Sequence, residues 1–394
     1  MRSLSRIDNS TLGRWWSTVD RATLACVGLL IGFGYVLMLA ASPAVAARIG
    51  ASRDMFILKQ VVFLSAAGAT VIAVSLLSPR GVRRLSLAGC LLALGATALT
   101  LVHGIEIKGA RRWIALPMMS VQPSEFLKPC FAVVTAWLLT QRRAARLAGR
   151  RFPGMLLAFC VSGVILMLLK AQPDIGMLTV ITTVFMAQLF IDGMNLFLVG
   201  VGVGSMAAAF VGAFLAFPHV RSRVERFLHP STGDHYQVDT ALQAFGNGGL
   251  MGRGPGEGRV KDLLPDAHAD FVFAVAGEEF GLLVCLFIIG VFCFVVVRTL
   301  LKLLAEDDPF VVLASCGLVT GFGLQAFVNM GSTLHLIPTK GMTLPFISYG
   351  GSSAMSVALT IGMILALTRR RARVREFPGP QAGQPGARRR ELAL

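Results

Sequence analysis

The sequence predicts an all-α polytopic membrane protein with about ten transmembrane helices. Of its 394 residues, 55% are apolar and 15% are charged, whereas an ordinary soluble chain has roughly 25% charged residues. The mean hydropathy is +0.69. Because one span needs about 20 apolar residues, this apolar content could supply about ten spans. These values exclude a soluble globular enzyme and an intrinsically disordered chain.

Ten apolar runs define the expected spans in chain order. They cover residues 22–42, 58–78, 86–104, 124–141, 154–170, 175–193, 195–217, 271–298, 310–330 and 346–368. We therefore expect a cytoplasmic segment at 1–21, a membrane domain at 22–368 with a large outer loop at 218–270, and a basic, disordered tail at 369–394. The first run ends in a signal-like Ala-Val-Ala at 44–46, but its length favours an uncleaved span.

The distribution of Lys and Arg orients the expected bundle. The net charge is +16, which in a soluble protein would suggest nucleic acid; here the basic loops are better explained by topology. Cationic residues cluster within 2–21, 79–85, 142–153 and 369–371. With ten spans these segments share one side, so both termini are expected in the cytoplasm. The seven cysteines fall in apolar runs without a C-x-x-C pair, which indicates buried thiols and no metal site.

Two outer segments, 105–123 and 218–270, carry cations against this bias. Cations on the outer face suit an anionic ligand such as a lipid phosphate. The alternative is that long loops cross the membrane whatever their charge. Within the second segment, seven glycines fall in the thirteen residues 246–258. With Arg253 and Arg259 this stretch could cradle a phosphate through backbone N–H groups, and a plain flexible turn fits equally well.

Several carboxylates lie at or inside the membrane edge. Asp270 precedes the eighth span, where it could cap that helix or act as a general base at the depth of a lipid headgroup. His268 and Asp266 could support it or help to hold a metal ion. Deeper in the span, Glu278 and Glu279 could relay protons in a transporter or pair with a cation such as Lys128. A structural ion pair or a cavity wall is the favoured interpretation of these two glutamates.

Polar residues also open other spans. Glu125 and Lys128 are spaced i, i+3, so they share one helix face and are expected to pair, with Lys128 facing the bundle interior. Trp113 could anchor at the interface or pack on a substrate sugar. Asp174 could cap the sixth span. The last outer segment, 338–353, combines Lys340 with small polar residues that include Ser348 and Ser352; it could serve close helix packing or form the floor of a substrate groove.

Six motifs together resemble the SEDS family, named for shape, elongation, division and sporulation. They are Lys-Gly-Ala-Arg-Arg-Trp-Ile (108–114), Gln-Pro-Ser-Glu-Phe-Leu-Lys (122–128), Gln-Pro-Asp-Ile-Gly (172–176), Gly-Gly-Leu-Met-Gly-Arg-Gly (248–254), Leu-Pro-Asp-Ala-His-Ala-Asp-Phe-Val-Phe-Ala-Val (264–275) and Ile-Ser-Tyr-Gly-Gly-Ser-Ser (347–353). They occur in the family's order and span residues 20–368. The segment 338–345 is similar to the family's division members.

The resemblance implies a ten-helix peptidoglycan glycosyltransferase that polymerises lipid II on the outer face of the bacterial cytoplasmic (inner) membrane, at the division septum. It also implies a class B penicillin-binding transpeptidase and other divisome membrane proteins as partners. By motif match, the family's essential aspartate falls on Asp270 and its loop tryptophan on Trp113. Its charged cavity residues fall on Arg112, Glu125 and Lys128. Lys108 departs from the usual Asn before Gly-Ala, away from the reacting centre.

The implied substrate sets the chemistry. Lipid II carries its sugar on an α-linked diphosphate and the glycan is β-1,4-linked, so one inverting displacement suffices. Asp270 is the candidate base. Positive charge for the leaving diphosphate could come from Arg112, Lys128, Arg253 and Lys340, and a divalent cation (Mg or Mn) could share that role. The rival functions are a lipid II flippase, which would need charges near the midplane, and a non-catalytic scaffold for the transpeptidase.

Overall fold

The structure, a computed structural model, describes residues 11–49, 53–107, 110–116, 119–216, 221–222, 224–225, 236–264, 266–338 and 341–369. Within these ranges, ten helices of 17 or more residues correspond to the ten expected spans. They are α2 (Arg21–Ile49), α3 (Arg53–Ser75), α4 (Pro79–His103), α5 (Pro123–Leu147), α6 (Gly154–Ala171), α7 (Ile175–Ile191), α8 (Leu196–Ala216), α12 (Val272–Leu303), α13 (Pro309–Thr333) and α14 (Gly351–Leu367). The N-terminal α1 (Thr11–Thr18) precedes them.

The all-α membrane fold is confirmed. Six of the helices (α2, α3, α4, α6, α12 and α13) are long and apolar enough to cross a membrane, and α7 and α14 are apolar but shorter. The count of ten spans stays a prediction. Cap residues explain two of the helix starts: the Ser78 side chain accepts from Gly81 N before Pro79 in α4, and the Asp308 side chain accepts from Phe310 N before Pro309 in α13. All seven cysteines lie in described residues and are free.

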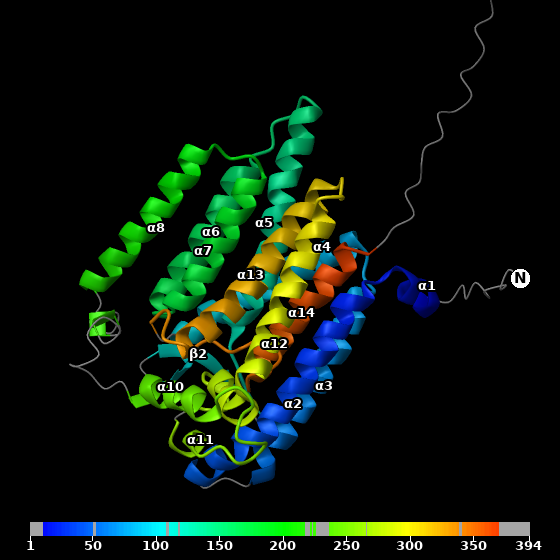
Figure 1. Cartoon of the computed structure of the whole chain (residues 1–394). Coiled ribbons are helices and arrows are strands. Elements are labelled where there is room, and N and C mark those ends of the chain that lie inside the picture. The colour runs from blue at the N-terminus through cyan, green and yellow to red at the C-terminus, as the bar shows by residue number, and fades with distance from the viewer. Residues whose placement is uncertain are drawn as a thin grey trace, which may run out of the picture.

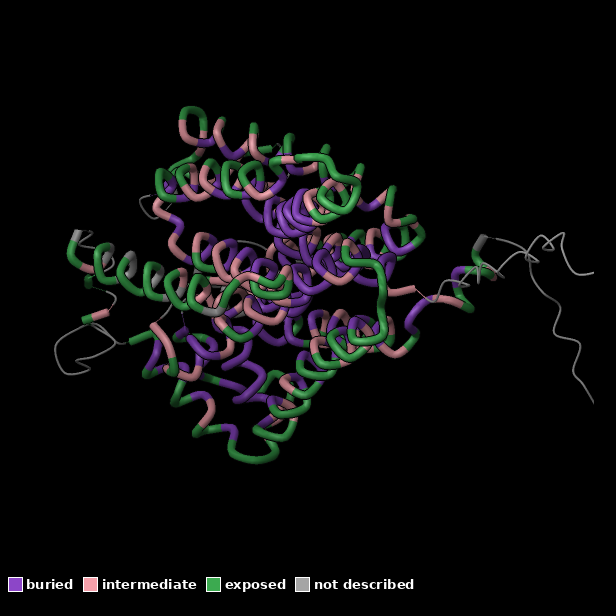
Figure 2. The backbone as a smooth tube through the Cα atoms, turned by 90° about the horizontal axis from the view of Figure 1, so that it is seen from above, coloured by how far each residue is buried: buried purple, intermediate pink, exposed green. Residues whose placement is uncertain are grey.

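The helices pack around α5 and α13 (Figure 1). Most residues of α5 between Pro123 and Leu139 are buried, because α4, α6, α7, α13 and α14 all contact this helix. Figure 2 shows the buried backbone concentrated in the middle of the bundle and the exposed residues on its outer helices. Exposed apolar side chains on the outer helices, such as Leu92 (75% exposed) and Met167 (75% exposed), suit contact with lipid.

Short elements gather at the end of the bundle opposite α1 (Figure 1). They include a three-stranded antiparallel sheet of β1 (Ile105–Ile107), β2 (Ala110–Ala115) and β3 (Ser120–Val121), in the order β1-β2-β3. Trp113 of β2 pairs with Ile105 of β1. The helices α10 (Tyr236–Gly248) and α11 (Val260–Leu263) lie at the same end. The sheet lies in the outer segment 105–123, for which the sequence predicted no strands.

The eighth expected span is broken, where the sequence predicted one continuous helix. Gly281 inside α12 has φ 79° and ψ −178°, a conformation that is essentially restricted to glycine. Residues 271–279 before the break are all buried. Four backbone hydrogen bonds join the break to the glycine-rich loop: Leu282 N to Gly249 O (2.9 Å), Leu283 N to Leu250 O (3.3 Å), Arg253 N to Glu278 O (3.0 Å) and Gly254 N to Glu279 O (3.0 Å). The loop thus supplies the partners that a break in a membrane helix needs.

This arrangement explains the glycines of 246–258. Gly252 has φ 81°, and a Cβ there would overlap the carbonyl of Glu279; a Cβ on Gly248 would overlap the carbonyl of Gly277. The loop backbone lies directly against α12, and its N–H groups donate to that helix. The loop glycines are therefore explained by close packing against α12, and the phosphate cradle stays a prediction.

Candidate active site

Asp270 lies in the turn that precedes α12, with its side chain partly exposed. The N-cap position of α12 is Phe271, without a side-chain cap hydrogen bond, so the capping role considered for Asp270 is not what the structure shows. Its carboxylate lies beside Gly341: a Cβ at that glycine, whose φ is 61°, would lie 3.2 Å from Asp270 Oδ2. Glycine at 341 therefore leaves the room that the carboxylate occupies.

Residues 268–270, here called the Asp270 segment, are held by hydrogen bonds to their three successive backbone carbonyls. The carbonyl of His268 accepts from Tyr349 N (2.9 Å). Those of Ala269 and Asp270 accept from Ser348 Oγ (2.6 Å) and Asn329 Nδ2 (3.0 Å). The donors come from α13 and from the loop before α14, so segments distant in sequence fix the backbone that carries Asp270.

Ser348 is buried, and its hydroxyl also accepts from Leu344 N at 2.8 Å. Both functions of the hydroxyl are used within the protein. The structure thus accounts for Ser348 through its hold on the Asp270 segment.

The His268 ring packs against Phe56 and Tyr349, with centroid separations of 5.2 Å to each, and those two rings also contact one another at 5.3 Å. Burial lowers the pKa of His268, and the nearby Asp266 only partly opposes this. A lowered pKa favours the neutral imidazole, which suits packing among aromatic rings. Among the residues that the structure describes, no group of three or more His, Cys, Asp or Glu side chains could hold a metal ion, so the Mg or Mn ion stays a prediction.

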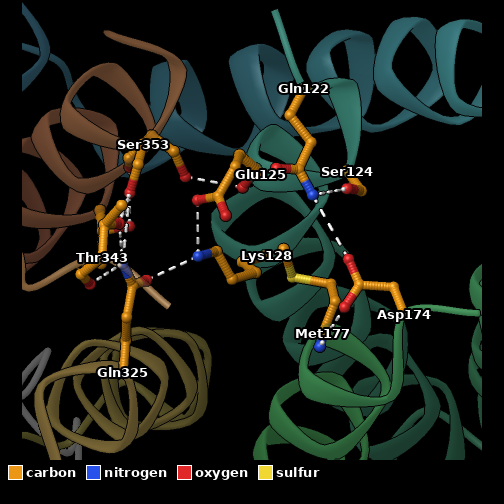
Figure 3. A network of polar contacts seen from close by, with 11 residues as sticks. Gln122, Ser124, Glu125, Lys128, Asp174, Met177, Gln325, Thr343 and Ser353 are labelled. Atoms are coloured by element: carbon orange, nitrogen blue, oxygen red, sulfur yellow. Dashed lines mark hydrogen bonds and ion pairs between the residues drawn. The ribbon is translucent and has the colours of Figure 1, made fainter. Parts of the chain in front are cut away.

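Lys128 is the centre of a buried polar network (Figure 3). Its Nζ lies 2.7 Å from Glu125 Oε2 and donates to Gln325 Oε1 at 2.6 Å. The side chain is only 8% exposed, which requires such partners. The expected i, i+3 pair and the interior position of Lys128 are both confirmed.

Gln325 extends the network to the loop before α14. Its Nε2 donates to Thr343 O (3.0 Å) and Ser353 Oγ (3.3 Å), and the Thr343 and Ser353 hydroxyls lie 2.6 Å apart. Ser352, the serine predicted from the sequence, is buried, but its neighbour Ser353 is the one that joins the network. Gln325 and Asn329 were not predicted, although two amides four residues apart in an apolar helix are a readable signal.

Arg112 joins the sheet to the turn between α6 and α7. It donates to the carbonyls of Gln172 (3.0 Å) and Pro173 (2.6 Å), and its Nη1 lies 3.5 Å from Asp174 Oδ2. Asp174 caps α7 by accepting from Met177 N, as expected, and it also accepts from Gln122 Nε2 at the start of α5 (Figure 3). Trp113, next in β2, is partly buried.

The remaining candidates lie apart from these contacts or outside the described residues. Arg253 is exposed and donates to Asn247 O within the glycine-rich loop (3.2 Å). Lys340, the segment 1–10 and the tail from 370 lie outside the described residues.

Glu278 and Glu279 have structural partners. Glu278 accepts from the amides of Arg259 (3.0 Å) and Val260 (3.1 Å). Glu279 pairs with Lys261 Nζ at 2.5 Å and accepts from Gly256 N. The structural ion pair is confirmed for Glu279, whose cation is Lys261 of α11 and not Lys128, whereas Glu278 is held by backbone amides.

The FtsW/RodA/SpoVE family of cell cycle proteins matches residues 20–373. The chain belongs to this family. A relative from Caulobacter vibrioides, "Probable peptidoglycan glycosyltransferase FtsW", is 41% identical over 374 residues, 94% of each chain. A protein of the same name from Escherichia coli O6:H1 is 34% identical and covers 88% of this chain and 85% of its own.

Solved structures share the fold. A chain of a peptidoglycan synthase complex, studied for the structural coordination of polymerization and crosslinking, matches with a TM-score of 0.72 at 26% identity and covers 89% of this chain and 97% of its own. The rod shape determining protein RodA of Thermus thermophilus matches with a TM-score of 0.66 at 25% identity and covers 90% and 97%. The multi-pass membrane fold and the family are thus established together.

Proposed function

We propose that this protein is a peptidoglycan glycosyltransferase that polymerises lipid II into β-1,4 glycan strands during septal cell-wall synthesis. The names of its relatives support the activity. The observation that carries the proposal is the Asp270 segment: a partly exposed carboxylate stands on a backbone whose three carbonyls are each held by another part of the protein. A catalytic group held in this way is preorganised.

The proposed reaction is a single displacement with inversion. The acceptor 4-hydroxyl attacks C1 of the donor sugar and its proton passes to the Asp270 carboxylate. The C1–O bond to the diphosphate breaks, and undecaprenyl diphosphate leaves with the bonding electron pair. A base held in this way contributes about 10²–10⁴-fold to the rate.

The cations divide by exposure in this proposal. Lys128 is buried and already paired with Glu125, so it shapes the interior wall of the site. Arg112 and Arg253 are more accessible and, with Lys340, are the candidates for the diphosphate charge. Trp113 is the candidate for packing on a substrate sugar. Ser348 and Ser352 are both buried, and we assign them to the support of the site. An Mg or Mn ion on the diphosphate stays part of the proposal, and no step is derived through it.

The same proposal places the chain in the inner membrane at the septum, with a class B penicillin-binding transpeptidase and other divisome proteins as partners. The solved peptidoglycan synthase complex supports the pairing of polymerisation with crosslinking. A lipid II flippase is less well supported, because the intramembrane carboxylates that favoured it, Glu278 and Glu279, are occupied by Lys261 and by loop amides.

The test uses purified full-length protein, alone and with its transpeptidase partner, and labelled lipid II. We expect wild type to produce a ladder of glycan strands and Asp270→Asn to produce none, because the amide cannot accept the proton. The matched control is Asp239→Asn, the same change at an exposed position of α10, which should polymerise like wild type.

Polymer from wild type and the control but not from Asp270→Asn would support the proposal. A wild-type protein that forms no polymer even with its partner would reject it in favour of translocation or scaffolding. Normal polymer from Asp270→Asn would reject Asp270 as the base. Titration with a chelator in the same assay tests the cation.

A further inference from the structure

Asn329 is completely buried in α13, yet its contacts lie outside that helix. Its Nδ2 donates to the carbonyl of Asp270 at 3.0 Å and to the carbonyl of Met342 at 2.6 Å. Each buried backbone carbonyl needs a hydrogen-bond donor. A primary amide is the side-chain group that supplies two N–H donors in one plane without a charge. Asn329 therefore bridges the turn that carries Asp270 to the loop that carries Gly341.

The bridge bears directly on the carboxylate. Gly341 is next to Met342 in the chain, and it lies beside Asp270 Oδ2. Holding the carbonyl of Met342 against that of Asp270 keeps Gly341 at the carboxylate. The amide of Asn329 thus sets both the backbone of the proposed base and the wall of its site.

Gln325 joins the Lys128 ammonium to the same loop, as Asn329 joins the Asp270 turn to it. It accepts from Lys128 Nζ at 2.6 Å, and its Nε2 donates to Thr343 O at 3.0 Å. Asn329 and Gln325 are four residues apart in one helix, about 6 Å along its axis. They bind the adjacent carbonyls of Met342 and Thr343, so both face the same loop.

We propose that Asn329 and Gln325 are positioning residues that fix the Asp270 carboxylate relative to the Lys128 ammonium across one turn of α13. This inference rests on the proposed function and deepens it. Neither amide touches substrate in this assignment. They act by holding the base and the buried cation at a constant separation while the displacement takes place.

The test is Asn329→Asp, which keeps the shape but replaces the NH2 donors with oxygen facing two carbonyls. We expect kcat for glycan synthesis to fall about 10–10²-fold, because small misplacements of a catalytic group have effects of that size. KM for lipid II should change by less than about threefold, since substrate contacts are untouched. A second carboxyl beside the base should also raise the pKa seen in the acid limb of the pH–rate profile.

Gln188 in α7 provides a matched control. It is also completely buried, and its Nε2 also donates to two backbone carbonyls, those of Ala132 (2.6 Å) and Leu313 (3.2 Å). Gln188→Glu makes the same chemical change in the packed core between α5, α7 and α13. We expect it to lower the thermal unfolding temperature without a change in kcat or in the pH profile of the folded fraction.

If Asn329→Asp does not accumulate in membranes, Gln325→Glu serves as the second test. This variant keeps the acceptor for Lys128 and loses the donor to Thr343 O. It should fold and show the same loss of kcat at unchanged KM. Wild-type kcat in a folded Asn329→Asp or Gln325→Glu variant, or an equal loss in Gln188→Glu, overturns the inference while wild-type polymer upholds the proposed function. A wild-type protein that makes no polymer rejects the function and the inference with it.

Discussion

Asp270 and the Glu278–Glu279 pair lie within ten residues of one another, but their carboxylates have opposite environments. At Asp270 it holds the backbone carbonyl and leaves the carboxylate partly exposed beside Gly341. At the glutamates it buries the side chains completely and surrounds the carboxylates with loop amides and Lys261. A partly exposed carboxylate at the edge of the bundle is open to a substrate, whereas a carboxylate buried among loop amides and a lysine holds a structure together.

The largest effect on stability is expected at Glu279, whose carboxylate has a structural role. Lys261→Met removes the cation from Glu279, whose side chain is 0% exposed, and leaves a buried charge without its partner. We expect a loss of about 3–5 kcal/mol in the free energy of unfolding, measured by denaturation in detergent micelles. The double variant Lys261→Met with Glu279→Gln should recover most of it. Unchanged stability in the single variant would show that the pair is not a structural device.

The next effect concerns chemistry. Asp270→Glu keeps the charge and moves the carboxylate outward by one methylene. We expect kcat for polymerisation to fall about 10²-fold, which corresponds to about 2.7 kcal/mol, with the unfolding free energy unchanged. Kinetics with labelled lipid II measure the loss. Full activity in this variant would mean that charge at this edge suffices and that the held backbone of the Asp270 segment serves another purpose.

The break in α12 at Gly281 lies two residues beyond Glu279 and joins the glutamate segment to the glycine-rich loop, so removing it should disturb the part of α12 that follows Asp270. Gly281→Ala places a Cβ against the amide of Gly252 in a backbone conformation that costs a non-glycine residue about 1–3 kcal/mol. We expect at least that loss of stability, together with reduced activity. Gly290→Ala in the same helix is the control, because a Cβ there meets nothing within 4 Å; it should be neutral or slightly stabilising. Equal stability of the two variants would contradict the structural role of the break.

The sequence predicted the helices well because their signal is local. Apolar runs placed all ten long helices, and the i, i+3 spacing predicted the Glu125–Lys128 pair. The break at Gly281 was not predicted, since a single glycine in an apolar run is tolerated in a helix and only the approach of the 246–258 loop shows why it is needed. The loop glycines themselves suggested a phosphate site because their true partner, α12, follows them in the chain and meets them only after folding.

The sequence predicted those residues of the candidate site whose type and depth in the membrane are unusual by themselves. It missed the residues whose role depends on contacts made in the folded protein. Asp270 and Lys128 stand out as charges at membrane depth. Asn329 is visible as an amide in an apolar helix, but the sequence does not tell which carbonyl it reaches. Likewise it does not tell which hydroxyl Ser353 contacts. Ser352 and Ser353 differ by one position on a helix, a rotation of about 100°, and the sequence alone could not decide which of them faces Gln325.

The smallest effect is expected at Asp20, a third carboxylate, which contacts the opposite end of α12. Like Glu279, it has a structural role. Asp20 accepts from Arg298 Nε at 2.8 Å and lies 2.6 Å from Lys302 Nζ. Burial by itself would raise the pKa of Asp20, but the hydrogen bonds from Arg298, Lys302 and Thr23 outweigh it and hold the pKa below its ordinary value. Both cations are about one-third exposed, so solvent weakens the pair.

We expect Asp20→Asn to lower the unfolding free energy by about 1 kcal/mol near neutral pH. Because the folded pKa lies below the unfolded value of about 3.9, this contribution is complete above about pH 4 and is lost as the pH falls through the folded pKa. The stability difference between wild type and Asp20→Asn should therefore be constant from pH 7 to about pH 5 and shrink at lower pH. A difference that grew on acidification would mean that Asp20 is protonated in the folded protein, and the C-terminal end of α12 would then be held by packing and not by charge.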